Sequence, residues 1–97
     1  MTSRATGRKV VLVSPDSALR LTLTHHQANK GERFSEFRTG LDHVALTVSS
    51  RADLLAWVNR LDELNVSHSE ITEGAAGWLV AFRDPDNIQL ELYTVEK

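Results

Sequence analysis

Two side chains that can bind a metal ion stand in the middle of strand-like sequence patterns. His43 lies in GLDHVALTV, residues 40–48, and Glu91 lies in DPDNIQLELY, residues 84–93. An imidazole nitrogen and a carboxylate oxygen held by rigid strands suit Zn, Fe, Mn, Ni or Mg rather than soft thiophilic ions. Two protein ligands alone make a poor site, so a third must come from elsewhere. His26 is the candidate, because it falls on the polar face of an earlier strand.

Each of these residues also has an ordinary structural interpretation. A histidine in the middle of a strand is often half-buried and hydrogen-bonded, and a glutamate on a solvated face needs no ligand. His68 lies in a weakly patterned stretch, where we expect it to be exposed. The sequence contains no nucleophile elbow, phosphate-binding loop or Ser-His-Asp arrangement. Residue types and spacing therefore leave metal binding and a purely structural role both open.

The composition of the 97 residues is that of one small globular domain, with 41% hydrophobic and 25% charged residues. The absence of cysteine excludes disulfides, thiolate metal sites and cysteine nucleophiles. A formal charge of -2 gives no reason to expect nucleic acid or an anionic membrane as a partner. The apolar run near the N-terminus is too short for a signal peptide or a membrane span. We expect a cytoplasmic protein with a flexible terminus over residues 1–8.

The elements that must position these side chains begin with a predicted hairpin. Residues 9–14 form a β-branched run, residues 15–17 have turn chemistry, and residues 18–26 alternate between apolar and polar side chains. The polar face of this second strand carries Arg20, Thr22, Thr24 and His26. Residues 27–40 have little pattern, and Phe34 and Phe37 are their only large apolar anchors. Long loops of this kind often cover or border a functional site.

A strand over residues 41–49 and one clear helix follow. Ser50 and Asp53 resemble a capping box that starts the helix, and Asn65 suits its C-terminal cap. An apolar stripe at helical spacing predicts packing on a sheet, with Trp57 in the core. The stripe consists of Leu54, Trp57, Val58, Leu61 and Leu64.

Three more strands complete the pattern. We expect a weak edge strand over residues 66–72, a strand over 78–83 and a last strand over 88–94, with turns at 73–77 and 84–87. The element order is then two strands, a long loop, and a complete βαβββ unit over about residues 41–94. This order predicts an α+β fold in which a curved mixed sheet forms a cleft.

The stretch from Gly40 to Tyr93 resembles the second βαβββ module of the vicinal oxygen chelate superfamily. That superfamily includes glyoxalase I, fosfomycin- and bleomycin-resistance proteins and extradiol dioxygenases. The resemblance rests on a G-x-x-H-x-A strand paired with D-P-D-N-x-x-x-E-L. Residues 9–40 resemble, less distinctively, the later strands of the first module, whose opening strand and helix have no counterpart here. The resemblance implies one domain, with a partial first module over residues 9–40 and the second module over 41–97.

The resemblance implies that His43 and Glu91 are metal ligands, and that Glu91 is also the catalytic residue. The other ligands of the superfamily come from the first module. Thr22 stands where glyoxalase-like proteins have a glutamate, and His26 lies further along the same strand. The residues expected to contact a substrate are Thr22, Thr47, Trp78, Gln89 and Tyr93.

Three accounts of function remain open at this point. The first is a metal-dependent lyase, isomerase or dioxygenase whose site is completed by His26 or by the second chain of a homodimer. The second is a metal-free module that binds a small molecule, as bleomycin-resistance proteins do. The third is a shortened chain, or a start site placed too late, that folds as a dimer but has lost its function. The substrate, the reaction and the identity of the metal are not indicated.

Overall fold

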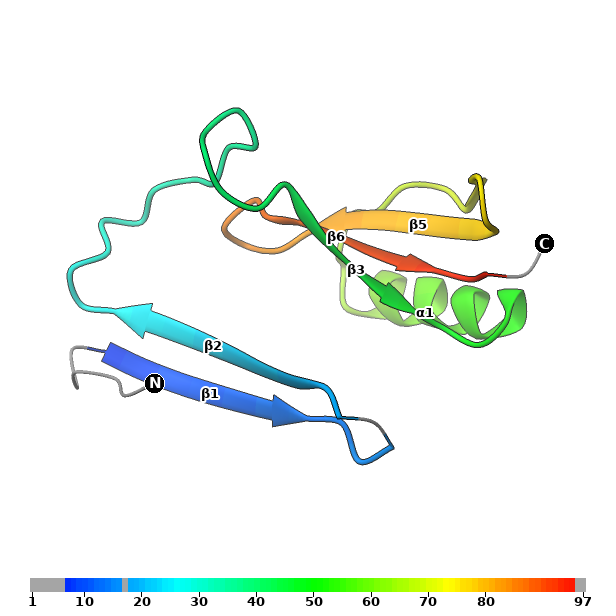
Figure 1. Ribbon diagram of the computed structural model, residues 1–97, viewed down its shortest axis with the longest axis horizontal. Helices are drawn as coiled ribbons and strands as arrows, with labels where there is room; N and C mark the ends of the chain where they lie inside the picture. Colours follow the sequence, from blue (N-terminus) through cyan, green and yellow to red (C-terminus); the bar gives the residue numbers. More distant parts are fainter. Residues whose placement is uncertain (1–6, 17, 96–97) are drawn as a thin grey trace. The chain divides into compact units, whose positions relative to one another are not determined.

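The computed structural model describes residues 7–16 and 18–95, which form two compact units with the boundary between Glu32 and Arg33. Both units contain strands, and the described residues contain one helix, so the predicted α+β class is confirmed (Figure 1). The flexible terminus expected at residues 1–8 falls mostly on residues 1–6, which lie outside the described residues. That both units belong to one domain stays a prediction.

The first unit is the predicted hairpin. Strand β1 (Gly7–Val13) pairs antiparallel with β2 (Arg20–His26), in a register that runs from Gly7 opposite His26 to Val13 opposite Arg20. The backbone N–H of Ser14 donates to the carbonyl of Leu19 at 3.1 Å and closes the connection. β1 begins two residues earlier than expected, because residues 7 and 8 extend the ladder to the end of β2.

One face of the hairpin is apolar and exposed. Val10 lies opposite Leu23, and Leu12 lies opposite Leu21, so these four side chains share a face, while Thr22 and Thr24 lie on the other face together with Val11 and Val13. The four are between 42% and 53% exposed. A two-stranded ribbon is marginally stable by itself, and burial of apolar area is what stabilises such elements. This face therefore needs a partner surface.

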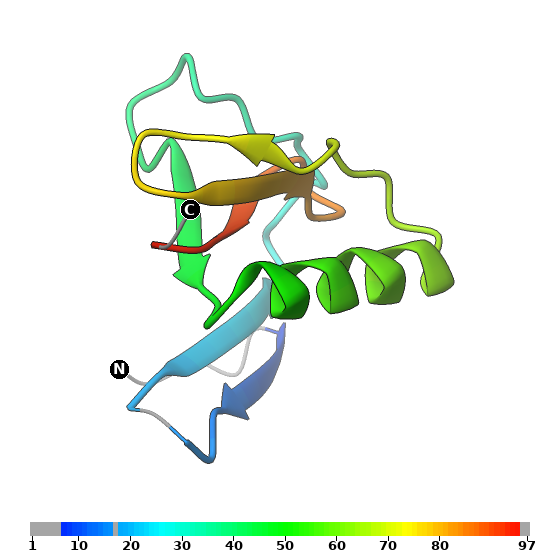
Figure 2. The ribbon, with the colours of Figure 1, turned by 90° about the vertical axis from the view of Figure 1, so that its right-hand side faces the viewer.

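The second unit is a βαβββ module. Its elements are β3 (His43–Thr47), α1 (Arg51–Glu63), β4 (Thr72–Glu73), β5 (Trp78–Arg83) and β6 (Gln89–Tyr93). The sheet has the order β3-β6-β5-β4, in which β3 and β6 are parallel and the other neighbours are antiparallel. Figure 2 shows α1 running along one face of this sheet.

The core forms where the apolar faces of α1 and the sheet meet. Leu54 of α1 and Val80 of β5 are completely buried, and Leu92 of β6 is 7% exposed. Leu46 and Val58 pack against this cluster from β3 and α1. In each strand every second residue points to the helix, so the alternate residues are left on the opposite, open face.

Both ends of the helix are set by local side-chain chemistry. The Ser50 hydroxyl accepts a hydrogen bond from the backbone N–H of Asp53 at 3.1 Å, as the cap motif predicted. Beyond the C-terminal cap, Asn65 adopts a φ of 57°, the left-handed conformation expected of it. Asn87, in the turn before β6, has a φ of 74° for the same reason.

The prediction that Trp57 lies in the core is wrong, since the residue is 49% exposed. Leu54 and Leu61 mark the centre of the buried stripe, and Trp57 lies at the margin of this stripe. β3 is an edge strand of the four-stranded sheet, so no further strand of this sheet continues beneath that side of the helix. Phe37 is likewise not an anchor of its loop, being 93% exposed.

The strand predicted over residues 66–72 is also largely wrong. Only a single bridge between His68 and Phe82 and the two residues of β4 pair with β5. The Ser69 hydroxyl accepts from the backbone N–H of Ala81 at 2.9 Å and donates to the carbonyl of Glu70. A polar side chain thus takes a place in the ladder that a backbone group would otherwise fill.

Replacement of Leu54 tests the position of the core. Leu54→Ala is expected to lower the free energy of unfolding by about 2–5 kcal/mol, because it leaves a cavity at a fully buried position. The neighbouring Leu55 is 48% exposed and supplies the matched control, with an expected loss within about 0.5 kcal/mol. Urea unfolding measures both variants, and equal losses would contradict this placement of the helix.

His68, expected to be exposed, is instead held at both ring nitrogens, and its side chain is only 15% exposed. Nδ1 lies 2.6 Å from the carbonyl oxygen of Ser69, and Nε2 lies 2.7 Å from Oδ1 of Asp62 at the end of α1. Because a carbonyl and a carboxylate only accept, both contacts are hydrogen bonds when both ring nitrogens carry protons, and the site therefore favours the protonated ring. The Ser69 carbonyl and then the Asp62 carboxylate raise the pKa of His68 above its usual value.

This arrangement predicts a pH dependence of stability. Because the pKa of His68 is raised in the folded state, its stabilising contribution is complete below the unfolded value of about 6.5. The contribution is lost as the pH rises through the pKa that His68 has in the folded state. The free energy of unfolding of the wild type should therefore exceed that of His68→Gln by more at about pH 6 than at about pH 9. A difference that grows with pH would overturn the assignment.

Candidate functional site

The parallel pairing of β3 and β6 brings the two predicted metal ligands together on the open face of the sheet. His43 lies opposite Gln89, and Ala45 lies opposite Glu91. Nε2 of His43 is 3.9 Å from Oε1 of Glu91. Two ligands bound at about 2.0–2.2 Å to one tetrahedral ion lie about 3.4 Å apart. A shift of about half an ångström would therefore let both atoms share an ion, and the pair fits as half of a metal site.

The second nitrogen of His43 is already engaged. Nδ1 lies 2.7 Å from Oδ2 of Asp42. This hydrogen bond, followed by the charge of Glu91, raises the pKa of His43. A carboxylate at Nδ1 is the usual partner of a metal-binding histidine, because it orients the ring and leaves the Nε2 lone pair for the ion. Asp42 precedes β3, which begins at His43, so strand alternation does not fix the direction of the Asp42 side chain.

Glu91 borders a cavity of about 230 Å³. Its neighbours across the sheet are Ala45 on one side and Ala81 on the other, and these small side chains leave room beside the carboxylate. The rest of the wall comes from the residue 74–77 loop, the ends of β5 and β6, and Thr94. The Glu91 side chain is 19% exposed, so its carboxylate is accessible from the cavity without being fully solvated.

Two charged residues that the sequence patterns did not single out complete the polar face. Arg83 Nη2 donates to Oε1 of Gln89 at 3.1 Å and to Oε2 of Glu36 at 3.3 Å. Hydrogen bonding to its own backbone, followed by the Arg83 guanidinium, lowers the pKa of Glu36. Arg83 lies on this face because it alternates with the core residues of β5, whereas Glu36 lies in an unpatterned loop and gave no signal.

The residues predicted to contact a substrate are distributed over both units. Thr47 and Tyr93 lie opposite each other on the open face, and Tyr93 lines the Glu91 cavity. Trp78 also lines the cavity, but it packs against the core, and the Arg51 guanidinium lies 4.6 Å from the centre of its ring. Thr22, like the proposed ligand His26, belongs to β2 of the first unit. Among the residues that the structure describes, no three metal-binding side chains form a group.

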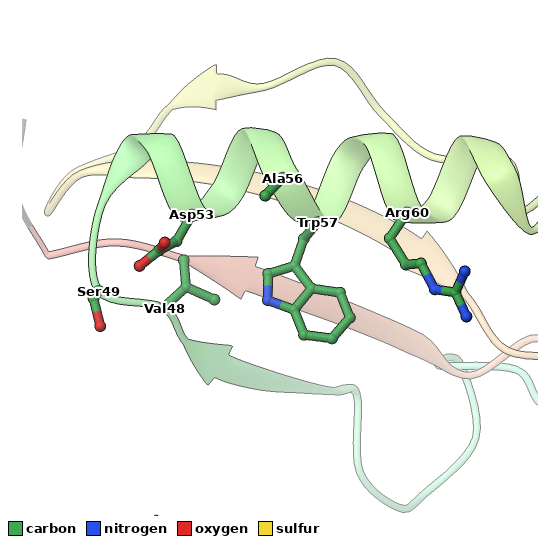
Figure 3. Close-up of a pocket in the computed structure, with 6 residues that line it drawn as sticks. All are labelled: Val48, Ser49, Asp53, Ala56, Trp57 and Arg60. Carbon is green, nitrogen blue, oxygen red and sulfur yellow. The ribbon is translucent and has the colours of Figure 1, made fainter.

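A second hollow lies beside the helix and is separate from the Glu91 cavity. It measures about 480 Å³, and Figure 3 shows the Trp57 ring descending from α1 beside Val48, with Asp53 and Arg60 along the helix on either side. This groove is larger than the Glu91 cavity but contains no pair of metal-binding side chains. We therefore place the candidate site at His43 and Glu91.

Comparison with known proteins identifies the family of the chain. The model of the glyoxalase/bleomycin resistance protein/dioxygenase superfamily matches residues 2–92. The chain belongs to this superfamily. No curated protein matches the sequence. Within residues 7–16 and 18–95, no helix of this superfamily member is long and apolar enough to cross a membrane.

Solved structures agree with the family. A glyoxylase/bleomycin resistance protein/dioxygenase domain from Frankia sp. EAN1pec is 33% identical over 97% of this chain and 73% of its own, with a TM-score of 0.86. A glyoxalase family protein from Enterococcus faecalis is 22% identical over 90% and 67%, with a TM-score of 0.68. The fosfomycin resistance protein FosX from Listeria monocytogenes is 18% identical over 91% and 66%, with a TM-score of 0.65. The predicted vicinal oxygen chelate fold is thereby confirmed.

Proposed function

We propose that this superfamily member binds a small molecule at the Glu91 cavity through a divalent metal ion held by His43 and Glu91. The observation that carries the proposal is the approach of His43 Nε2 to Glu91 Oε1 at 3.9 Å. Asp42 bonds the other nitrogen of the histidine, and Gln89 bonds the other oxygen of the glutamate. The free atom of each residue is thus directed toward the other, as two ligands of one ion require.

The chemistry proposed for this site is that of a metal-dependent lyase, isomerase or dioxygenase. A bound divalent ion would supply Lewis acidity to two neighbouring oxygens of the substrate. Glu91 is the proposed catalytic residue, because its carboxylate borders the cavity and can accept a proton from a bound molecule. Thr47, Gln89 and Tyr93 are proposed to contact the substrate from the open face, with Trp78 at the cavity wall. A volume of about 230 Å³ favours a small ligand.

The proposal includes a homodimer in the cytoplasm that supplies the missing ligands. His26 of the same chain or a residue of the second chain would complete the coordination of the ion. The dimer is supported by the exposed apolar face of the hairpin formed by β1 and β2. A second copy is a reasonable cover for this face, because most soluble oligomers are symmetric homo-oligomers.

A metal-free binding module is the second candidate. Among the described residues of the open face, only His43 and Glu91 approach each other as two ligands would, and Asp42 bonds the other nitrogen of His43. The wall of the Glu91 cavity also has an apolar part, contributed by Ala45, Leu79 and Tyr93. The two candidates differ in one respect, because a metal-free module would bind its ligand equally well with and without a chelator.

Metal binding tests the first candidate directly. Protein purified without chelator is expected to carry a stoichiometric divalent metal, measured by elemental analysis. Titration calorimetry of Mn²⁺ into metal-stripped protein is expected to show at least about 100-fold weaker binding for His43→Ala and for Glu91→Gln, since each removes a ligand. Glu63→Gln, at an exposed position of α1 where Glu63 pairs with Arg60, is the matched control for Glu91→Gln and should bind normally. Absence of metal, with no effect of either variant, would refute the proposal.

The dimer is tested at the apolar face of the hairpin. Light scattering is expected to give the mass of a dimer for the wild type. Leu23→Asp should raise the dissociation constant by at least about 100-fold, because a carboxylate would be buried without a partner. Thr24→Asp, the next residue of the same strand but on its other face, should remain dimeric. A folded wild-type monomer would contradict the proposed assembly.

A further inference from the structure

An unbroken series of hydrogen bonds leads from the loop before β3 to Glu91. Arg83 lies at its centre. Its Nη2 donates to Oε2 of Glu36 at 3.3 Å and to Oε1 of Gln89 at 3.1 Å, and its Nη1 donates to the carbonyl of Asn87 at 2.9 Å. Nε2 of Gln89 then donates to Oε2 of Glu91 at 2.7 Å.

The order of donors and acceptors gives this series a direction. A guanidinium only donates, so the oxygen of the Gln89 amide must face Arg83. The amide nitrogen must then face Glu91, where it donates to Oε2. Oε1 remains, and this is the atom that lies 3.9 Å from His43 Nε2. The orientation of the amide therefore decides which carboxylate oxygen is left for an ion.

The sheet makes Gln89 well suited to hold Glu91. The residues opposite Glu91 on β3 and β5 are both alanines, whose side chains offer no polar atom. Gln89, two residues earlier on the same strand and face, lies between His43 on β3 and Arg83 on β5. Its amide can thus connect the guanidinium to the carboxylate without any backbone rearrangement.

The loop before β3 holds the far end of the series. The backbone N–H of Phe34 donates to the carbonyl of Asp86 at 2.8 Å, and the Asn87 amide donates to the carbonyl of Phe34 at 3.1 Å. These bonds fasten the loop to the turn before β6 and bring Glu36 to Arg83. The carboxylate balances the guanidinium charge, which would otherwise oppose a cation bound nearby.

We propose that Arg83 is a positioning residue, which orients the Gln89 amide so that Gln89 holds one oxygen of Glu91 and leaves the other for the metal ion. The proposal rests on the metal site proposed above. It assigns Arg83 a role through Gln89 and no direct contact with the ion. The loss of either residue should then free the Glu91 carboxylate to rotate away from His43.

The test is a double-mutant cycle with Mn²⁺ alone as the probe. Arg83→Met and Gln89→Leu are each expected to weaken Mn²⁺ binding by about 10–100-fold, the usual effect of losing a residue behind a ligand. Because Arg83 acts through Gln89, the double variant should bind no more weakly than Gln89→Leu. Arg83→Lys should fall between Arg83→Met and the wild type. Arg60→Met removes an arginine that pairs with Glu63 on the helix surface and should bind as the wild type does.

Additive losses would show that Arg83 does not act through Gln89, and unchanged affinities would show that neither residue positions Glu91. Either result, with wild-type protein that binds Mn²⁺, overturns this inference and leaves the proposed function intact. Should Arg83→Met fail to fold, Arg83→Lys takes its place in the cycle.

A measurement without metal separates the two proposals if the wild type binds no Mn²⁺. Nitrogen-15 NMR of metal-free protein is expected to show the Gln89 side-chain amide with two well separated proton signals. In Arg83→Met and in Glu91→Ala these signals should move to the positions of a solvent-exposed amide. A Gln89 amide unaffected by both variants would overturn the positioning role, whatever the outcome with metal.

Discussion

The parallel pairing of β3 with β6 is the constraint on which the rest of the second unit depends. Parallel neighbours cannot be joined by a tight turn, so the chain must leave the sheet and return. Here α1, β4 and β5 lie between the two strands, and α1 covers one face of the sheet. The covered face takes the apolar residues. Alternation along the strands then places His43 and Glu91 on the open face, where a ligand can reach them.

The open face is organised around one carboxylate. Alanines lie opposite Glu91 on both neighbouring strands and leave space beside it. Because an alanine side chain has no polar atom, neither of these opposite residues can hold the carboxylate by a hydrogen bond. The holding group lies along β6 instead, in Gln89, and is itself oriented by Arg83. A flexible carboxylate loses side-chain entropy when it binds an ion. A network of satisfied hydrogen bonds that already holds the carboxylate makes this loss smaller when an ion binds.

Much of the fold was predictable because its signals are local. Alternation in residues 20–26 and 43–47, the cap at Ser50 and the left-handed Asn65 all depend on near neighbours, and the structure confirms them. The errors fall where local pattern competes with tertiary context. Trp57 belongs to an apolar stripe, but it lies at the margin of the part of this stripe that is buried, and it is 49% exposed. The sequence predicted an exposed His68, whereas the fold brings Asp62 and Ser69 against its two ring nitrogens.

The sequence by itself determined the βαβββ order, the strand faces and the two residues able to bind a metal ion. These follow from periodicity and motif, which are properties of the chain read in one dimension. Only the tertiary structure decided that Asp42 bonds His43 and that Arg83 and Glu36 stand behind Gln89. Glu36 and Arg83 are 47 residues apart. Such contacts depend on how the loop docks and how the strands are registered, and no local pattern encodes either.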